Sequence, residues 1–249
     1  MSRGSARPDA RVFVGTAGWS LPRAVQEHFP GEGPHLARYA RVFPAVEINT
    51  SFYRSHRPSI YERWANSTPD AFRFSLKIPK TITHGLRLAD TGALLDGFLD
   101  ESAALGSGRS CLLVQLPPSL ALDSSVAGEF LAMVRERWTG DIALEPRHAT
   151  WFTAPASALL ERFAVARVVA DPVRAEGGEV PAGSSGLAYY RLHGSPRTYY
   201  SSYDAGYLAA LADRLRAHRG GGITTWCIFD NTASGAAAAN ALELLRLLE

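Results

Sequence analysis

The sequence predicts an α/β fold of the (β/α)8 TIM-barrel type, in a single domain. Eight apolar runs rich in Val, Ile, Phe and Tyr alternate along the chain with stretches of helical periodicity. Strands that alternate with helices are joined in parallel by right-handed crossovers. The chain has 249 residues, and this is the usual size of a closed barrel built from eight such units.

The eight predicted strands are short runs of β-branched and aromatic residues, which favour extended backbone. They span residues 12–18, 45–52, 72–78, 110–116, 141–147, 166–171, 187–193 and 223–230.

Seven other stretches repeat apolar residues at intervals of three and four, as amphipathic helices do. They span residues 35–43, 58–66, 91–105, 123–137, 154–163, 204–218 and 234–248. An oxygen-bearing side chain precedes three of these helices and predicts their N-caps at Asp123, Asp204 and Ser234.

One crossover departs from the pattern. The segment VRAEGGEVPAGSSG, which follows Asp171-Pro172, is too rich in Gly and Pro for a helix. The sixth crossover is therefore predicted to be a loop, and a loop of this length usually forms a lid or a binding element. An open doubly wound sheet is the rival fold, but GTAGWS after the first strand is not its GxGxxG turn. We expect a disordered tail over residues 1–10 and the barrel over residues 11–249.

Composition narrows the class of protein. Apolar residues make up 46% and charged residues 20% of the chain, which excludes intrinsic disorder. No apolar run approaches the roughly 20 residues that cross a bilayer, and the N-terminus lacks the apolar stretch of a secretion signal. We therefore expect a cytoplasmic protein with no membrane partner. The net charge of +2 is too small to make nucleic acid the expected partner.

Two scarce residue types are informative. Cys111 and Cys227 are the only cysteines, and their apolar surroundings predict core positions rather than a disulfide. Lys77 and Lys80 are the only lysines among 26 basic residues. A lysine kept in such an arginine-rich chain is a mild indication of function.

Polar side chains stand at the carboxyl ends of seven of the eight predicted strands. Residues two apart on a strand point the same way, and barrel enzymes carry their chemistry at this end, the mouth of the barrel. The pattern predicts either a site at the mouth or a ring of structural ion pairs. These residues are Glu47, Asn49, Lys77, Gln115, Glu145, Arg147, Asp171, Arg191, His193, Asp230 and Asn231, and the first strand runs into Thr16, Ala17, Gly18 and Trp19.

Seven motifs follow one another along the chain: GTAGWS, VEINTSFYR, FRFSLKIPKTITH, LLVQLPPSL, ALEPRHATW, YYRLHG and FDNTASGAAAANA. With these motifs the chain resembles the YecE-like family, a domain family of unknown function, from about residue 12 to 245. The resemblance implies a (β/α)8 barrel and a distant similarity to sugar isomerases. It implies no established activity.

The predicted catalytic residues are Glu145, Glu47, His193 and Lys77. Glu145 would act as a general base or metal ligand, and Glu47 would complete a pair of carboxylates whose pKa values differ. The alternative for Glu145 is a structural salt bridge with Arg147.

Lys77 has two interpretations as well. A lysine near an apolar barrel axis has a lowered pKa and can form a Schiff base with a carbonyl substrate. The alternative is a cation that pairs with Glu47 or Glu145.

A metal site would require four of these residues to converge: Glu47, Glu145, Asp171 and His193, with His84 and His148 as alternative ligands. Carboxylates with one imidazole suit Mn²⁺, Mg²⁺ or Zn²⁺. No local spacing such as HExxH supports the site, so no cofactor is predicted and a divalent metal stays an alternative.

Residues 231–235 lead from the eighth strand into a helix and offer free N–H groups where such barrels bind phosphate. Arg197 would add charge there, and Tyr199, Tyr200 and Tyr203 would add stacking surface. The predicted substrate-binding residues are Trp19, Asn49, Tyr53, Gln115, Arg147, His148, Asp171, Arg191, Asp230 and Asn231.

These patterns predict an enzyme that uses acid/base chemistry on a small polar molecule, sugar-like or phosphorylated, at the mouth. It would be an isomerase, a lyase or a hydrolase. One alternative is a non-catalytic protein that binds a metabolite or a nucleic-acid end, with Trp19, Tyr199 and Tyr200 stacking on the ligand. Another is a divalent-metal-dependent isomerase or nuclease-like enzyme.

Overall fold

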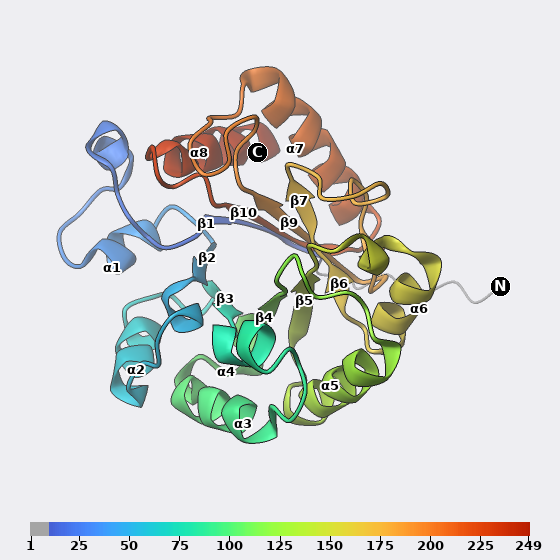
Figure 1. Cartoon of the computed structure of the whole chain (residues 1–249). Helices are drawn as coiled ribbons and strands as arrows, with labels where there is room; N and C mark the ends of the chain where they lie inside the picture. The colour runs from blue at the N-terminus through green and yellow to red at the C-terminus, as the bar shows by residue number, and fades with distance from the viewer. Residues whose placement is uncertain (1–9) are drawn as a thin grey trace.

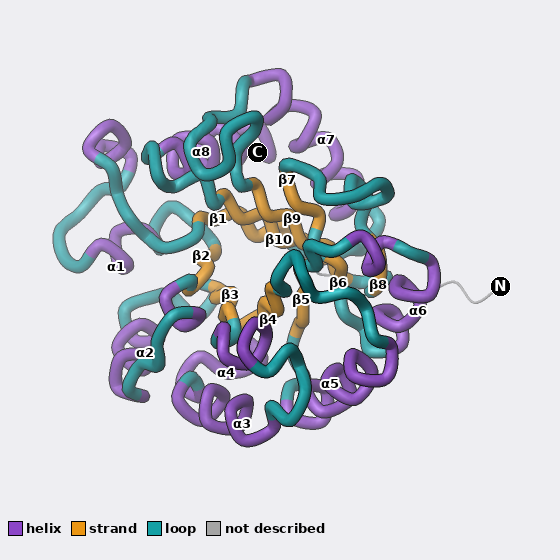
Figure 2. The backbone as a smooth tube through the Cα atoms, in the orientation of Figure 1, coloured by secondary structure: helices purple, strands orange, loops and turns teal. Residues whose placement is uncertain are grey.

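The computed structural model describes residues 10–249. Its strands lie at the centre of the molecule and its helices surround them (Figure 1 and Figure 2). The tail expected over residues 1–10 lies outside the described residues, except for Ala10. No helix among the described residues is long and apolar enough to cross a membrane.

The strands form two sheets, in the orders β1-β10-β9-β7 and β2-β3-β4-β5-β6-β8. Every pairing is parallel except that of β8 with β6. The strands are β1 (Val12–Thr16), β2 (Ala45–Ile48), β3 (Arg73–Lys77), β4 (Ser110–Gln115), β5 (Asp141–Glu145), β6 (Ala166–Arg167), β7 (Val169–Asp171), β8 (Ala182–Gly183), β9 (Leu187–Leu192) and β10 (Thr224–Phe229).

Two connections relate the sheets to each other. Ala17, just after β1, forms a parallel bridge with Glu47 of β2. At the other side, Val168 alone separates β6 from β7, so the chain passes directly from one sheet to the other. The structure is thus a mixed α/β fold built from parallel sheets.

The α-helices are α1 (His35–Tyr39), α2 (Pro58–Asn66), α3 (Gly92–Glu101), α4 (Gly106–Arg109), α5 (Ser124–Arg137), α6 (Ala154–Arg162), α7 (Ala205–Gly220) and α8 (Ala236–Leu248). Short turns of other helix types occur at η1 (Arg23–His28), η2 (Thr50–Phe52), η3 (Thr81–Gly85), η4 (Ala103–Leu105) and η5 (Ala149–Phe152).

The predicted strands and helices are confirmed in position and type; most have shorter ends, whereas α7 extends to Gly220, two residues beyond its predicted end. Each predicted strand range contains a strand, and the sixth holds both β6 and β7. Asp123 and Asp204 cap α5 and α7 by accepting backbone N–H bonds. The N-cap predicted at Ser234 is wrong. The hydroxyl of Ser234 donates to the Tyr200 carbonyl at 2.6 Å, and Gly235, with φ of 79°, precedes α8 instead.

The sixth crossover is a loop, as predicted. Main-chain pairing attaches this loop to the sheet, because β8, which is part of the loop, pairs with β6. The Arg167 guanidinium also donates to the carbonyls of Gly177 and Val180, at 2.6 and 3.3 Å. These bonds hold the loop along its middle.

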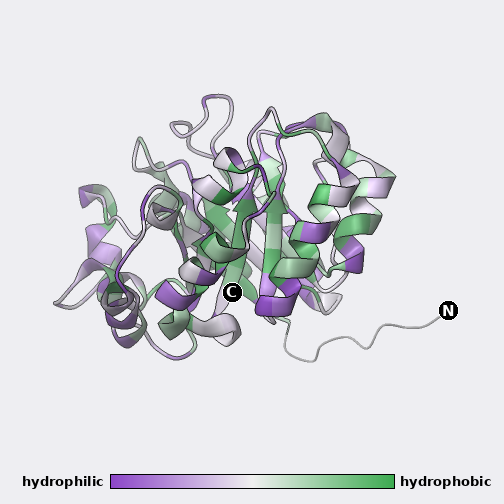
Figure 3. Ribbon diagram, turned by 60° about the horizontal axis from the view of Figure 1, so that its bottom comes forward, coloured by the Kyte–Doolittle hydropathy of each residue, from purple (hydrophilic) through white to green (hydrophobic). Residues whose placement is uncertain are grey.

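The apolar core has two parts. The larger cluster lies between the strands and the helices, and Figure 3 shows the strands there as hydrophobic. The smaller cluster takes alternate residues from strands of both sheets, so these inner faces pack on one another. It consists of Phe13, Ala45, Cys111, Leu113, Ala143, Ala166, Val168, Leu187, Tyr189, Trp226 and Ile228. Cys111 and Cys227 are fully buried free thiols, as predicted.

Candidate functional site

Polar residues continue the inner faces of the strands beyond the smaller apolar cluster. On β9, Tyr189 belongs to that cluster, and Arg191 and His193 follow at two-residue steps on the same face. In register, Ile228 of β10 lies beside Arg191, so the next inward residue of that strand is Asp230. The carboxyl ends of the strands therefore bring polar side chains together above an apolar floor.

Arg191 is the centre of this group. Its Nε and Nη2 donate to the two oxygens of Glu47, at 2.9 and 2.6 Å. Its Nη1 donates to Glu145 at 2.6 Å and to Gln115 at 3.3 Å, and Nη2 also reaches Asp230 at 3.0 Å. The Arg191 side chain is fully buried. Every nitrogen of the guanidinium thus has an acceptor in the protein.

His193 joins two of the same carboxylates. Its Nδ1 lies 3.0 Å from Asp230 and its Nε2 lies 3.1 Å from Glu145. Burial alone would lower the pKa of His193, but the charge of Glu145 and the hydrogen bonds to both carboxylates raise that pKa above its ordinary value. The geometry therefore favours an imidazolium that donates from both nitrogens. We call Arg191, His193, Glu47, Glu145 and Asp230 the charged cluster.

Two acids of the cluster, Glu145 and Asp230, are held ionised. Burial would raise the pKa of Glu145, but the positive charges of Arg191 and His193 hold it well below its usual range. Burial likewise opposes ionisation of Asp230, and the same two cations lower its pKa. A carboxylate with such a low pKa is a weak base, because little free energy is gained when it takes a proton.

Lys77 lies beside the cluster without joining it. Its Nζ donates to the Asn49 side-chain oxygen at 2.9 Å and lies 4.3 Å from the centre of the Phe52 ring. Within residues 10–249 no carboxylate forms an ion pair with this ammonium group, although only 4% of the residue is exposed. Burial and the charge of Arg191 lower the pKa of Lys77 to about 8.

The ion pair with Glu47 or Glu145, which was the alternative interpretation of Lys77, is therefore not formed. The reason is that Arg191 already occupies both carboxylates, with two bonds to Glu47 and one to Glu145. Arg147 does form its expected contact with Glu145, at 3.3 Å, and its side chain is 17% exposed.

Positive charge gathers at the solvent side of the cluster. Burial lowers the pKa of His84, and the charges of Arg147, Lys77 and Lys80 lower it further. The His84 ring packs edge-on against Phe52, with 5.1 Å between ring centres. The charges of Arg147, Lys77 and Lys80 thus act together at His84, and such a group of positive charges attracts anions.

Several predicted site residues lie apart from the cluster. Asp171 pairs in register with Leu192, on the face opposite to Arg191, and accepts a hydrogen bond from the Tyr203 hydroxyl at 2.6 Å. That hydroxyl in turn accepts the Gly194 N–H at 2.7 Å. Asp171 therefore fixes the loop after β9.

Three other predicted site residues serve local structure as well, and a fourth lies at the surface. The Asn231 amide nitrogen donates to the Ser201 carbonyl and to Asn240, at 3.0 and 2.9 Å. His148 caps η5 by accepting the Thr150 N–H. Trp19 packs edge-on against Trp64, and Tyr53 is 64% exposed.

The four proposed metal ligands do not converge. Arg191 lies between the carboxylates of Glu47 and Glu145, where a cation would have to sit, and Asp171 faces away. Over the part of the chain that the structure describes, no group of three or more His, Cys, Asp or Glu side chains is arranged to hold a metal ion.

The phosphate position predicted at residues 231–235 is nearly closed. The cavity there, between Thr16, Gly18, Thr232 and Gly235, has a volume of about 30 Å³, room for one or two waters. Arg197 lies over the Tyr200 ring, 4.0 Å from its centre.

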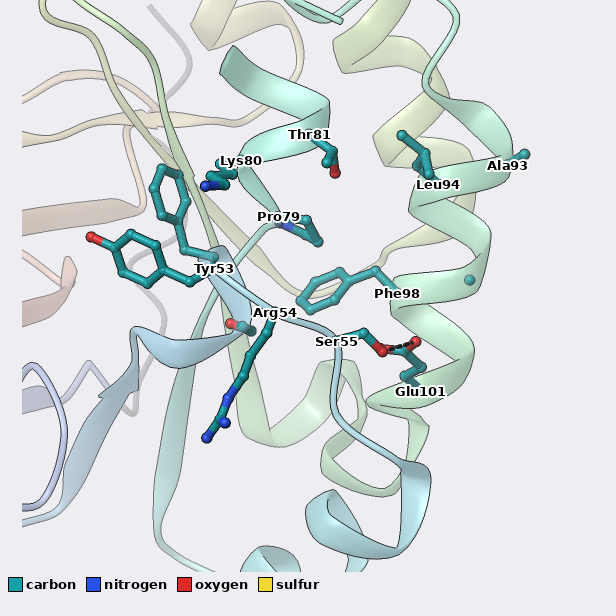
Figure 4. A pocket seen from close by; sticks show the side chains of 13 residues that line it. Tyr53, Arg54, Ser55, Pro79, Lys80, Thr81, Ala93, Leu94, Phe98 and Glu101 are labelled. Carbon is teal, nitrogen blue, oxygen red and sulfur yellow. Dashed lines mark hydrogen bonds between the residues drawn. The ribbon is translucent and has the colours of Figure 1, made fainter. Parts of the chain in front are cut away.

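A larger pocket of about 300 Å³ lies between α3 and the turns that follow β2 and β3 (Figure 4). We call it the α3 pocket. Its main walls are Phe52, Tyr53, Lys80, Leu94, Phe98 and Glu101. Phe52 and Lys80 were not singled out from the sequence as site residues, although the scarcity of lysine already marked Lys80. Phe52 gave no such signal, because its role depends on the turn at η2 that places it under Lys77.

Comparisons with known proteins agree with the motifs. Residues 13–249 match the profile of a family described as "Protein of unknown function DUF72". The chain is similar to the UPF0759 protein YecE of Escherichia coli (strain K12), with 34% identity over 106 residues, which are 43% of this chain and 38% of that protein. It thus spans about two fifths of the YecE length. It is also similar to the UPF0759 protein YunF of Bacillus subtilis (strain 168), with 24% identity over 96% of this chain and 95% of that one.

Two crystal structures of DUF72 family proteins have a similar fold. That of Enterococcus faecalis V583 has a TM-score of 0.77 and 21% identity, over 96% of this chain and 98% of that one. That of Thermotoga maritima MSB8 has a TM-score of 0.75 and 25% identity, over 95% of this chain and 98% of that one.

Proposed function

The chain belongs to the DUF72 family, and from that premise we propose that it is an enzyme in which Lys77 moves a proton on a small anionic carbonyl compound. The observation that supports this most directly is a buried lysine without an ion-pair partner among the described residues and with a pKa of about 8. Keeping an ammonium group in that position costs free energy, so a structural role alone does not account for it.

The proposal includes a closed (β/α)8 barrel with the site at its mouth. Three features support closure: the parallel bridge from Ala17 to Glu47, the single residue between β6 and β7, and the inner apolar cluster shared by both sheets. In a closed barrel the charged cluster would cap this inner core, and Lys77 would face the solvent side.

Lys77 is suited to take and return a proton near neutral pH. With a pKa of about 8, about one molecule in ten carries the neutral amine at pH 7, and the protonated form gives up its proton more readily than an ordinary lysine does. In the proposed step the neutral amine takes a proton from the carbon next to a carbonyl group. The electron pair of that C–H bond passes to the carbonyl oxygen as an enolate, and the ammonium then returns a proton to the same carbon, on either face, as in an isomerase.

Glu145 and Glu47 take positioning roles in this proposal. Glu145, the general base expected from the sequence, is held ionised by Arg191 and His193 and would be a weak base. Both glutamates hold the Arg191 guanidinium, whose charge is a main reason after burial that the pKa of Lys77 is low. Arg147 and Lys80 would draw in the anionic group of the substrate.

Deuterium exchange tests this function even though the substrate is unidentified. The protein is incubated in D₂O with small hydroxy- and keto-acids and with phosphorylated sugars, and loss of the C–H signal next to the carbonyl is followed by proton NMR. We expect exchange in at least one compound, and we expect Lys77→Met and Lys77→Arg to abolish it. Arg63→Met, which removes an exposed positive charge on α2, is the matched control and keeps exchange.

The competing function is a binding protein without chemistry. It is favoured by the charged cluster itself, because Arg191 and both nitrogens of His193 already have protein partners. If compounds bind to the wild type but none exchanges, or if Lys77→Met exchanges as fast as wild type, the enzymatic proposal is wrong.

A further inference from the structure

We propose that the α3 pocket binds the aromatic ring of an anionic substrate, whose acidic group is held at Lys80. The assignment of this ring to the same molecule that meets Lys77 rests on the proposed function. The walls and charges of the pocket support a bound ring independently of that function.

The walls of the pocket are mainly apolar and partly open to solvent. Phe52 and Tyr53 pack edge to face, with 5.0 Å between ring centres, and α3 supplies Leu94 and Phe98 on the other side (Figure 4). Tyr53 is 64% and Leu94 is 42% exposed. At about 300 Å³ the pocket is at the lower end of the range for small-molecule sites. Flat aromatic walls favour a planar apolar occupant.

The charges of the pocket are divided between its two sides. The Lys80 ammonium lies 5.9 Å from the centre of the Tyr53 ring, and Arg54 also lines the pocket. On the side of α3, Glu101 accepts a hydrogen bond from the Ser55 hydroxyl at 2.5 Å (Figure 4). The carboxylate is thus engaged, whereas the Lys80 side makes no ion pair with any described residue. An occupant with a ring and a negative group complements this arrangement.

The pocket adjoins Lys77 through one side chain. Phe52 lines the pocket and also lies under the Lys77 ammonium, at 4.3 Å from its ring centre. A ring seated between Tyr53 and Leu94 would therefore lie beside Lys80 and close to Phe52, the side chain that the pocket shares with Lys77. The inferred substrate class is an aromatic acid with a carbonyl group, rather than an unsubstituted sugar.

Disulfide tethering at Gly97 tests the pocket with defined probes. Gly97 lines the pocket on α3, and a Cβ there meets no atom within 4 Å, so Gly97→Cys is compatible with the fold. The two native cysteines are fully buried and burial raises the pKa of both thiols, so they are inert. Gly220→Cys on α7, also in open space, is the matched control.

Each variant is equilibrated with three probe disulfides in excess thiol, and the adducts are measured by intact mass spectrometry. The probes carry a benzoate, a benzylammonium or a short alkyl carboxylate. We expect Gly97→Cys to retain the benzoate about tenfold more than either other probe, which corresponds to about 1.4 kcal/mol. Gly220→Cys is expected to retain all three equally.

One further variant identifies the cause. Adding Lys80→Gln to Gly97→Cys should remove the preference for benzoate over benzylammonium and keep the preference for a ring over an alkyl chain. Equal retention of the three probes by Gly97→Cys, or a preference for benzylammonium, would overturn the proposal, the latter because Glu101 would then dominate the pocket.

The failure of this proposal differs from the failure of the proposed function. In a Lys77→Met background the benzoate preference at Gly97→Cys should be unchanged, because Lys80 and the aromatic walls supply it. Loss of deuterium exchange in that background tests the role of Lys77 alone. If the wild type exchanges deuterium into non-aromatic compounds and Gly97→Cys shows no preference among the probes, the proposed function stands and the proposal for the α3 pocket is wrong.

Discussion

The Lys77 ammonium group lies 4.3 Å from the centre of the Phe52 ring. An ammonium over an aromatic face is stabilised by the negative charge of the ring face, typically by about 0.5–1 kcal/mol or more when water is excluded. The contact replaces part of the lost hydration of the lysine but not all of it, because burial and the charge of Arg191 still lower the pKa to about 8.

This relationship predicts the titration of Lys77. The chain has only two lysines, so selective ¹³Cε-lysine labelling gives two NMR signals. We expect one signal to titrate near pH 8 and to disappear in Lys77→Arg. Phe52→Leu should lower that midpoint by roughly half a unit, because the protonated form loses its aromatic partner. A midpoint above pH 10 in the wild type would contradict the assignment of Lys77 as a proton carrier.

A second prediction concerns the centre of the charged cluster. Arg191→Met leaves Glu47, Glu145 and Asp230 buried without their shared counter-charge, and we expect a loss of about 3–5 kcal/mol in the free energy of unfolding. Urea denaturation measures it.

Arg246→Met is the control for this loss, because the Arg246–Glu243 pair is on the surface and its loss should leave the urea midpoint unchanged. If Arg191→Met proves too unstable to purify, Glu47→Gln provides a milder test with the same sign. A midpoint equal to wild type in both variants would show that the cluster contributes little to stability.

How far the sequence predicts this site can be judged from single strands. The two-residue period of β9 correctly places Arg191 and His193 on one face, since the alternation of a strand is fixed by its backbone. The same rule could not place Asp171, because nothing in the sequence shows which face of β7 is turned inward. The register, with Ala170 beside Arg191, settles it.

The ion-pair partners of the charged side chains were harder to predict than the positions of these side chains on their strands. Arg191 binds three carboxylates at once. Glu47 and Glu145 are therefore already paired, and Lys77 forms no ion pair with either of them, although the numbers of acids and bases at the mouth allowed one. Such choices depend on distances between strands far apart in sequence. The α3 pocket also escaped sequence reasoning, because its walls come from short turns and from one helix face.

A third prediction is the dependence of stability on pH. His193 has a folded-state pKa above its ordinary value of 6.5, so its contribution is complete below pH 6.5 and is lost as the pH rises through the folded-state value. Glu145 has a pKa below its ordinary 4.5, so its contribution is complete above about pH 4.5 and is lost as the pH falls through its folded-state value. The cluster therefore stabilises the fold most between about pH 4.5 and 6.5.

Urea midpoints measured from pH 4 to 8 check this profile. We expect His193→Gln to remove the decline above pH 6.5 and to leave the acid side in place. The exposed His35 offers a control, since His35→Gln should follow the wild-type curve. A wild-type stability that keeps rising from pH 6.5 to 8 would contradict a protonated His193 in the folded state.

The last prediction separates a functional Lys77 from a structural one by the sign of a stability change. The folded-state pKa of Lys77 is about 8, below its ordinary value of 10.5. The unfolded chain therefore binds more protons between these two values, and the lysine destabilises the fold at pH 7 by up to about 3 kcal/mol. Lys77→Met keeps the length of the side chain without its charge. It should raise the free energy of unfolding at pH 7 by about 1–3 kcal/mol while it abolishes exchange, as expected where function is kept at the expense of stability.

The pH dependence of the wild type gives a second check of this sign. As the pH rises from 8 to 10.5, loss of the proton from Lys77 should increase the free energy of unfolding of the wild type, and this increase should be missing in Lys77→Met. A lysine kept for structure would give the reverse result, with Lys77→Met less stable than wild type at pH 7.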